Sequence, residues 1–172
     1  HLTAHTEQAW KRDLTWQTID ISRASLKELL ETPVLFISGS RAPNFSPLEK
    51  KLLKDYVEQG GFIFAEAAQG NGCNGAEFEE YFRQLVVELF EQPLERLPPE
   101  HPIWFAESQV NAADLPDDAW LYGVQTCCRL GVVYSPITLS CRWQLNLPYG
   151  IKPDFAPAAQ ADLDAATKIG IN

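Results

Sequence analysis

The sequence predicts an α/β fold, in which a mainly parallel sheet carries helices on both of its faces. Residues 46–61 have the signals of one capped helix, from Ser46 and Pro47 at its start to Gly60 at its end. The next residues, 62–65, form a short and wholly apolar run, which is typical of a strand buried on both sides. Predicted strands and helices alternate along the chain, and this order indicates a parallel sheet.

The other elements follow from capping and periodicity. Ser25 and Glu28 form a capping box for a short helix through Leu30. Apolar residues at helical spacing predict a helix over residues 76–90. Further helices are expected over residues 1–12 and 158–168, the latter ending at Gly170. Strands are expected over residues 14–20, 34–38, 120–124 and 129–134. Residues 93–102 are expected to be irregular, and residues 140–157 are expected to form a loop. Two apolar stripes are expected in the core: Leu48, Leu52, Leu53, Tyr56 and Val57 on one helix, and Phe78, Phe82, Leu85, Val86 and Leu89 on the other.

Length and composition set the class of protein. The chain has 172 residues, of which 45% are hydrophobic, so we expect one domain over residues 1–172 with a sizeable core. The net charge of −9 argues against a nucleic-acid partner. No apolar run approaches the length of a membrane span, so no membrane contact is expected. The chain begins inside a predicted helix and ends at a helix stop, as expected of a domain excised from a longer protein, and the sequence leaves its compartment open.

The cysteines do not predict a metal centre or a cofactor. Cys73, Cys127, Cys128 and Cys141 match no zinc-binding spacing. We expect small, buried side chains, with Cys127 and Cys128 on opposite faces of a strand. A disulfide or a bound metal is the alternative, and the sequence does not choose among the possible disulfide pairings.

Candidate site residues cluster where predicted strands end. Glu66 closes the strand over residues 62–65, and in open α/β sheets ligands bind at the carboxyl ends of strands. A partly desolvated carboxylate there suits a general base, although it could instead cap a turn or pair with a basic residue. The glycine-rich residues 70–75 could offer backbone amides to an anion, with a flexible turn as the alternative. Four candidate ligand-binding residues lie in the two loops at this edge: Ser40, Arg41, Gln69 and Asn71.

Other polar and aromatic residues allow two interpretations. His101, among prolines, is a candidate acid or orienting group, and the alternative is a hydrogen bond that holds a rigid turn. Cys73 would need a base to act as a nucleophile. Arg129 and Arg142 could each clamp a carboxylate. Core or loop packing is the favoured interpretation of three aromatic residues that could otherwise form a binding surface: Trp104, Trp143 and Tyr149.

Several segments together resemble the domain-of-unknown-function family 4159, found in bacterial proteins. They are residues 14–16, 33–39, 56–64, 97–103, 132–136 and 169–172. The resemblance implies a three-layer, flavodoxin-like sheet of the class I glutamine amidotransferase type, related to trehalose-utilisation-like domains. It also implies a family without an assigned activity.

The sequence departs from this resemblance where catalytic groups are expected. The amidotransferase nucleophile would fall at Glu66 or Ala67, and Cys73 comes too late. We therefore expect a non-catalytic module that binds a small molecule or another protein domain. The alternative is a hydrolase of an amide or sugar derivative, with Glu66 as general base and His101 as acid or orienting group. A metal site of Glu66, His101 and Cys73 is a third, weaker hypothesis.

Overall fold

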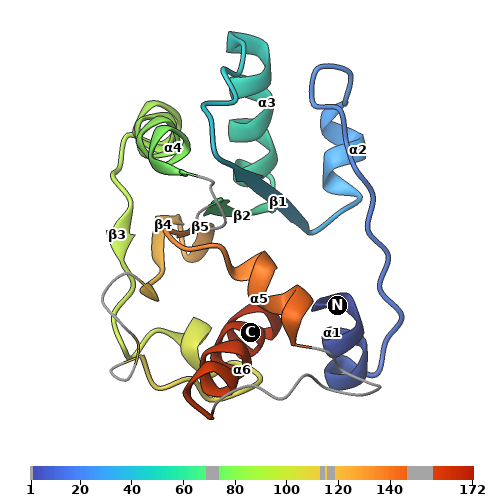
Figure 1. Cartoon of the computed structure of the whole chain (residues 1–172). Coiled ribbons are helices and arrows are strands. Elements are labelled where there is room, and N and C mark those ends of the chain that lie inside the picture. Colours follow the sequence, from blue (N-terminus) through green and yellow to red (C-terminus); the bar gives the residue numbers. More distant parts are fainter. Residues whose placement is uncertain (1, 69–73, 113–114, 116–118, 147–156) are drawn as a thin grey trace. The chain divides into compact units, whose positions relative to one another are not determined.

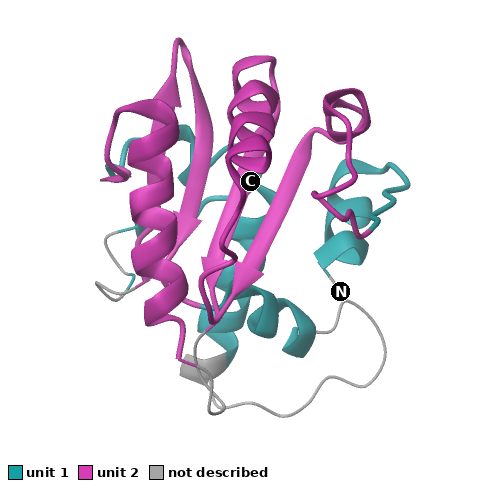
Figure 2. Ribbon diagram, turned by 90° about the horizontal axis from the view of Figure 1, so that it is seen from above, with its two compact units in different colours: residues 1–17, 98–115, 138–172 teal, residues 18–97, 116–137 magenta. Residues whose placement is uncertain are grey.

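The computed structural model describes residues 2–68, 74–112, 115, 119–146 and 157–172. The chain divides into two compact units (Figure 2). Unit 1 comprises residues 1–17, 98–115 and 138–172, and unit 2 comprises residues 18–97 and 116–137. The single domain over residues 1–172 stays a prediction.

Unit 2 is built on an open, mixed sheet (Figure 1). Its described strands are β1 (Val34–Gly39), β2 (Phe62–Ala67), β3 (Glu95–Arg96), β4 (Tyr122–Thr126) and β5 (Arg129–Ser135). They lie in the order β1-β2-β5-β4-β3, in which β2 pairs in parallel with both β1 and β5, whereas β4 is antiparallel to β5 and to β3. The α/β class is therefore confirmed, and the expectation of a mainly parallel sheet holds for β1, β2 and β5.

Three helices of unit 2 lie on one face of this sheet: α2 (Leu26–Leu30), α3 (Pro47–Glu58) and α4 (Ala76–Phe90) (Figure 1). In-register residues of neighbouring strands project to the same side, so Ile63 and Ala65 share the helix-covered face with Val132 and Tyr134. The sequence predicted helices on both faces of the sheet. Within unit 2, this prediction is supported for one of the two faces. The core on this face also contains Leu53, Tyr56, Val57, Phe78, Phe82, Leu85, Val86 and Leu89.

The sequence signals of the unit 2 helices are confirmed in detail. Ser25 and Ser46 each cap a helix through a complete capping box, with Glu28 and Glu49 respectively. Helix α4 has the predicted bounds, and its whole predicted stripe is buried. The stripe of α3 is wrong at one position, since Leu48 is 80% exposed. Leu48 lies in the first turn of α3, whereas the buried residues of this helix begin at Leu53.

The antiparallel pairing of β4 and β5 departs from the prediction. Only Cys127 and Cys128 connect these strands, and Thr126 pairs directly with Arg129. A parallel pair needs a crossover of a dozen or more residues, so two residues permit a hairpin alone. The short strand β3 lies in the stretch that was expected to be irregular, where the guanidinium of Arg96 lies 3.6 Å from the centroid of the Trp120 ring.

Cysteine placement also departs from the prediction. Cys127, Cys128 and Cys141 are exposed and free, not buried. Cys127 and Cys128 form a turn and do not belong to a strand. Cys73 lies outside the described residues.

Two buried tyrosines in the core of unit 2 have opposite hydrogen-bonding states. The Tyr56 hydroxyl donates to the carbonyl of Thr32 at 3.0 Å. The Tyr134 hydroxyl lies near the carboxylate of Glu79 but makes no hydrogen bond of normal geometry among the described residues, and burial, reinforced by Glu79, raises its pKa. A buried hydroxyl without a partner costs stability, whereas a hydrogen-bonded one contributes to it.

Substitution of each tyrosine by phenylalanine is expected to give opposite results. Tyr134→Phe should leave the free energy of unfolding unchanged or raise it by about 1 kcal/mol, because it removes an unsatisfied hydroxyl. Tyr56→Phe should lower it by about 1 kcal/mol, because it leaves the Thr32 carbonyl unpaired. Urea unfolding of the two variants checks the difference, and equal losses in both would contradict it.

Unit 1 contains the helices α1 (Leu2–Trp10), α5 (Leu139–Leu145) and α6 (Pro157–Ile171) and the 3₁₀ turn η1 (Pro102–Trp104). The helix expected over residues 1–12 is confirmed by α1. The prediction of a loop over residues 140–157 is wrong at residues 140–145, which belong to α5. The buried indole of Trp143 in α5 donates from Nε1 to the carbonyl of Ala166 in α6 at 2.8 Å, which supports the packing interpretation of this residue.

Helix α6 does not stop at Gly170, as the sequence suggested. It continues through Gly170 to Ile171. A Cβ at Gly170 would lie 2.7 Å from Cδ1 of Leu2 and 2.9 Å from Cε2 of Trp143. The glycine therefore permits close packing of α6 against α1 and α5 and does not end the helix.

Residues 14–20 form no strand, although their alternating pattern predicts one. Trp16 is 78% exposed. A segment with a period-two pattern forms a strand only when a neighbouring strand hydrogen-bonds to its backbone N–H and C=O groups. None of the described strands pairs with residues 14–20.

Candidate functional site

The carboxyl edge of the parallel strands carries the first predicted site residue. Glu66 lies near the end of β2, in register with Ser38 of β1 and Ser135 of β5, so the three side chains belong to one face of the sheet. The hydroxyl of Ser38 donates to Oε1 of Glu66 at 3.2 Å. The hydroxyl of Ser135 donates to the carbonyl of Ile137 at 2.8 Å. The structure thus places Glu66 at the predicted edge and joins it to a serine.

Glu66 is completely buried, whereas the sequence predicted a carboxylate that is only partly desolvated. Its exposed fraction is 0%. A general base must come within hydrogen-bond distance of the proton that it removes. A fully buried carboxylate bound to Ser38 is better suited to holding the ends of β1 and β2 together.

The loop after β1 carries Ser40 and Arg41, and side chains of α4 hold it. Oε1 of Glu77 accepts from the backbone N–H of Ala42 at 3.2 Å. The hydroxyl of Tyr81 accepts from the backbone N–H of Phe45 at 2.8 Å. The loop is therefore fixed at two points to a helix that itself packs on the sheet.

Ser40 and Arg41 are the predicted site residues that remain available for a ligand. Arg41 is exposed and Ser40 is partly buried. Neither side chain makes a hydrogen bond or ion pair among the residues that the structure describes. Gln69 and Asn71, the other two candidates, lie outside the described residues.

His101 belongs to unit 1, and its ring caps η1. Nδ1 accepts from the backbone N–H of Ile103 at 3.2 Å, which assigns the proton of the neutral ring to Nε2. Burial lowers the pKa of His101 and disfavours the imidazolium form. The ring can therefore donate from Nε2 and orient a partner, but it is poorly placed to deliver a proton as an acid. Glu66, in contrast, belongs to unit 2.

The lowered pKa of His101 predicts a pH effect on stability. Because the unfolded ring binds a proton more readily than the folded one, stability is present above the unfolded pKa and is lost as the pH falls through the folded pKa. Between about pH 7 and about pH 5, the wild type should lose more stability than His101→Asn, whose amide oxygen can cap η1 without titrating. Thermal unfolding at both pH values tests this, and parallel losses in both proteins would refute it.

Two arginines that could have clamped a ligand are used inside the fold. Arg129 donates to the carbonyl of Val57, in the last turn of α3, and to the carbonyl of Gly61, just beyond the helix, at 3.0 Å. Arg142 pairs with Asp162 at 2.7 Å and donates to the carbonyl of Thr138. Arg129 therefore supports the negative end of the α3 dipole, and Arg142 joins α5 to α6.

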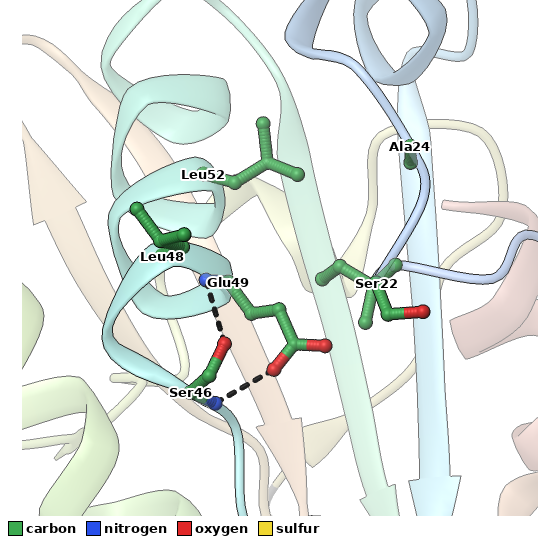
Figure 3. Close-up of a pocket in the computed structure, with 7 residues that line it drawn as sticks. Ser22, Ala24, Ser46, Leu48, Glu49 and Leu52 are labelled. Atoms are coloured by element: carbon green, nitrogen blue, oxygen red, sulfur yellow. Dashed lines mark hydrogen bonds between the residues drawn. The ribbon is translucent and has the colours of Figure 1, made fainter.

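A shallow, open pocket of about 340 Å³ lies elsewhere in unit 2 (Figure 3). It is formed by the segment before α2 and the first turns of α3. Figure 3 shows Ser46 and Glu49 turned toward each other in their capping box, so both polar side chains are already paired. The pocket contains none of the predicted site residues; its lining consists of Ile21, Ser22, Ala24, Ser46, Leu48, Glu49 and Leu52.

Sequence reasoning missed Ser38 as the partner of Glu66. The signal was present, because both residues come near the ends of predicted parallel strands, whose carboxyl ends meet at one edge. It also missed the side chain of Asn172, which accepts from the N–H groups of Glu107 and Ser108 and donates to the carbonyl of Ile103. Two of the segments that carry the family resemblance, residues 97–103 and 169–172, are joined in this way.

Comparisons with known proteins give a family and no activity. Within the described part of the chain, no group of three or more His, Cys, Asp and Glu side chains could hold a metal ion. No helix among the described residues is long and apolar enough to cross a membrane. No curated protein matches the chain. A family model, Domain of unknown function (DUF4159), matches residues 1–172, and the chain therefore belongs to this family.

Proposed function

We propose that this chain is a non-catalytic binding module whose site lies at the carboxyl edge of its parallel strands. The complete burial of Glu66 is the observation that carries this proposal. It leaves the best candidate base without access to a substrate proton. The neutral, capping ring of His101 supports the same conclusion, because it disfavours the acid role.

In this proposal the loop after β1 makes the contacts and Glu66 positions it. Arg41 offers a guanidinium to an anionic or carbonyl-bearing group of a small molecule or protein partner, and Ser40 offers a hydroxyl. Glu77 and Tyr81 hold the loop in place, so less conformational entropy is lost on binding. Gln69 and Asn71 complete the proposed contacts.

The finer fold assignment belongs to the same proposal. We assign unit 2 to the flavodoxin-like, class I glutamine amidotransferase-like group, related to trehalose-utilisation-like domains. The parallel pairs β1·β2 and β2·β5 and the helices α3 and α4 between these strands support it.

A thermal-shift screen of small anionic and polar compounds tests the binding role. A compound that binds should raise the Tm of the wild type and of Glu66→Gln, whose amide oxygen can still accept from Ser38. Arg41→Ala should bind it about tenfold more weakly or worse, because a charged hydrogen bond is lost. Lys54→Ala, which removes a surface cation from the last turns of α3, is the matched control and should bind as the wild type does.

The hydrolase alternative predicts a different pattern. Glu66 would act as the base and His101 as the orienting group, which requires the two residues to meet at one substrate. A compound consumed by the wild type but not by Glu66→Gln, followed by mass spectrometry, would favour the hydrolase. Unchanged binding in Arg41→Ala would refute the proposed loop contacts.

A further inference from the structure

The hairpin between β4 and β5 carries two adjacent thiols at its tip. Cys127 and Cys128 make up the whole two-residue connection, and both side chains are exposed and free. No peptide bond of the described residues is cis, so their Cα atoms are about 3.8 Å apart. The tip lies at the start of β5, at the opposite edge of the sheet from Glu66.

Neither thiol has an evident structural purpose. Exposed sulfurs contribute little to the core. Cys127 has a φ of 57°, in the left-handed region that favours glycine or asparagine at this position of a two-residue hairpin. A cysteine held in an unfavourable conformation without a packing gain is an outlier that points to function.

Geometry disfavours a disulfide between these thiols. Disulfides usually join Cα atoms about 4.4–6.8 Å apart, so a bond between adjacent residues is strained and easily reduced. An atom that bridges the two sulfurs lengthens the connection between them, so the short Cα–Cα distance no longer causes strain. Zinc would require four ligands, and no group of three or more metal-ligating side chains occurs among the described residues. A trivalent arsenic atom that already carries one carbon substituent needs only two sulfurs.

We propose that Cys127 and Cys128 form a dithiol site that captures a monosubstituted trivalent arsenical. Two S–H bonds break and two As–S bonds form, while the oxygen on arsenic leaves with both protons as one water molecule. Arsenic stays trivalent, so no oxidant or reductant is consumed. The product is a ring closed through both sulfurs and the peptide between them.

Intact-mass titration of the full chain with phenylarsine oxide tests this proposal. We expect one phenylarsenic unit per chain with loss of one water, removed by a dithiol competitor but not by an equal concentration of a monothiol. Cys127→Ser and Cys128→Ser should each weaken capture about 100-fold, because two-point attachment is lost. Cys73→Ser and Cys141→Ser are the matched controls and should capture as the wild type does.

Each other outcome contradicts the proposal. Capture unchanged by Cys127→Ser or Cys128→Ser, or lost in Cys73→Ser or Cys141→Ser, would assign the dithiol to other cysteines. No capture by the wild type would exclude the site. Cys127→Gly adds a readout that does not depend on the arsenical: its Tm should rise because the left-handed turn is relieved, and a fall would contradict the strain at this position.

Discussion

Replacing Trp104 with alanine is expected to lower the free energy of unfolding by about 3–5 kcal/mol. The side chain is fully buried, and its Nε1 donates to the carbonyl of Pro98 at 2.9 Å. The backbone carbonyl of Trp104 accepts from Val110 at 2.7 Å. The substitution therefore opens a large cavity and loses a hydrogen bond that closes residues 98–104.

Two variants make this prediction specific, with urea unfolding as the measurement. Trp16→Ala removes the same side chain where it is 78% exposed and should change stability by less than about 0.5 kcal/mol. Trp104→Phe keeps most of the volume and should cost less than Trp104→Ala. If Trp104→Ala proves as mild as Trp16→Ala, the described packing of this tryptophan is wrong.

Gly61→Ala is expected to destabilise unit 2 by about 1–3 kcal/mol, since a new methyl group would be forced into a packed core. A Cβ at Gly61 would overlap the ring of Tyr56, with Cε2 and Cζ as its nearest neighbours. That ring cannot easily move, because it is buried and its hydroxyl is bound to Thr32. The backbone N–H of Gly61 also donates to the carbonyl of Tyr56 at 2.8 Å, which keeps the two residues together.

A double-mutant cycle separates this overlap from a general effect of alanine. In a Tyr56→Leu background the ring is absent, so Gly61→Ala should cost less than in the wild type. Denaturant unfolding of the four proteins gives the coupling free energy. An equal cost in both backgrounds would show that the ring is not what excludes a side chain at Gly61.

Local signals predicted much of unit 2. Capping boxes at Ser25 and Ser46 and the apolar stripe of α4 depend on residues three or four positions apart, so the sequence contains them completely. The buried strands β1 and β2 followed from short apolar runs. The antiparallel direction of β4 and β5 could also have been predicted, because the few residues between the predicted strands 120–124 and 129–134 exclude a crossover.

Other features depend on contacts that no local pattern contains. Gly170 has the signal of a helix end, but its neighbours Leu2 and Trp143 come from distant helices and make it a packing position. The alternation of residues 14–20 predicts a strand, yet pairing is decided by a neighbouring strand. Glu66 was placed at the correct edge, but its burial depends on the side chains around it, so its position could be predicted and its exposure could not.

Amide hydrogen exchange of the wild type, with and without a compound found by thermal shift, tests the binding site most directly. We expect ligand-dependent protection in peptides that cover residues 38–43, where Ser40 and Arg41 lie. Protection confined to residues 21–24 and 46–52, which line the pocket of Figure 3, would contradict it.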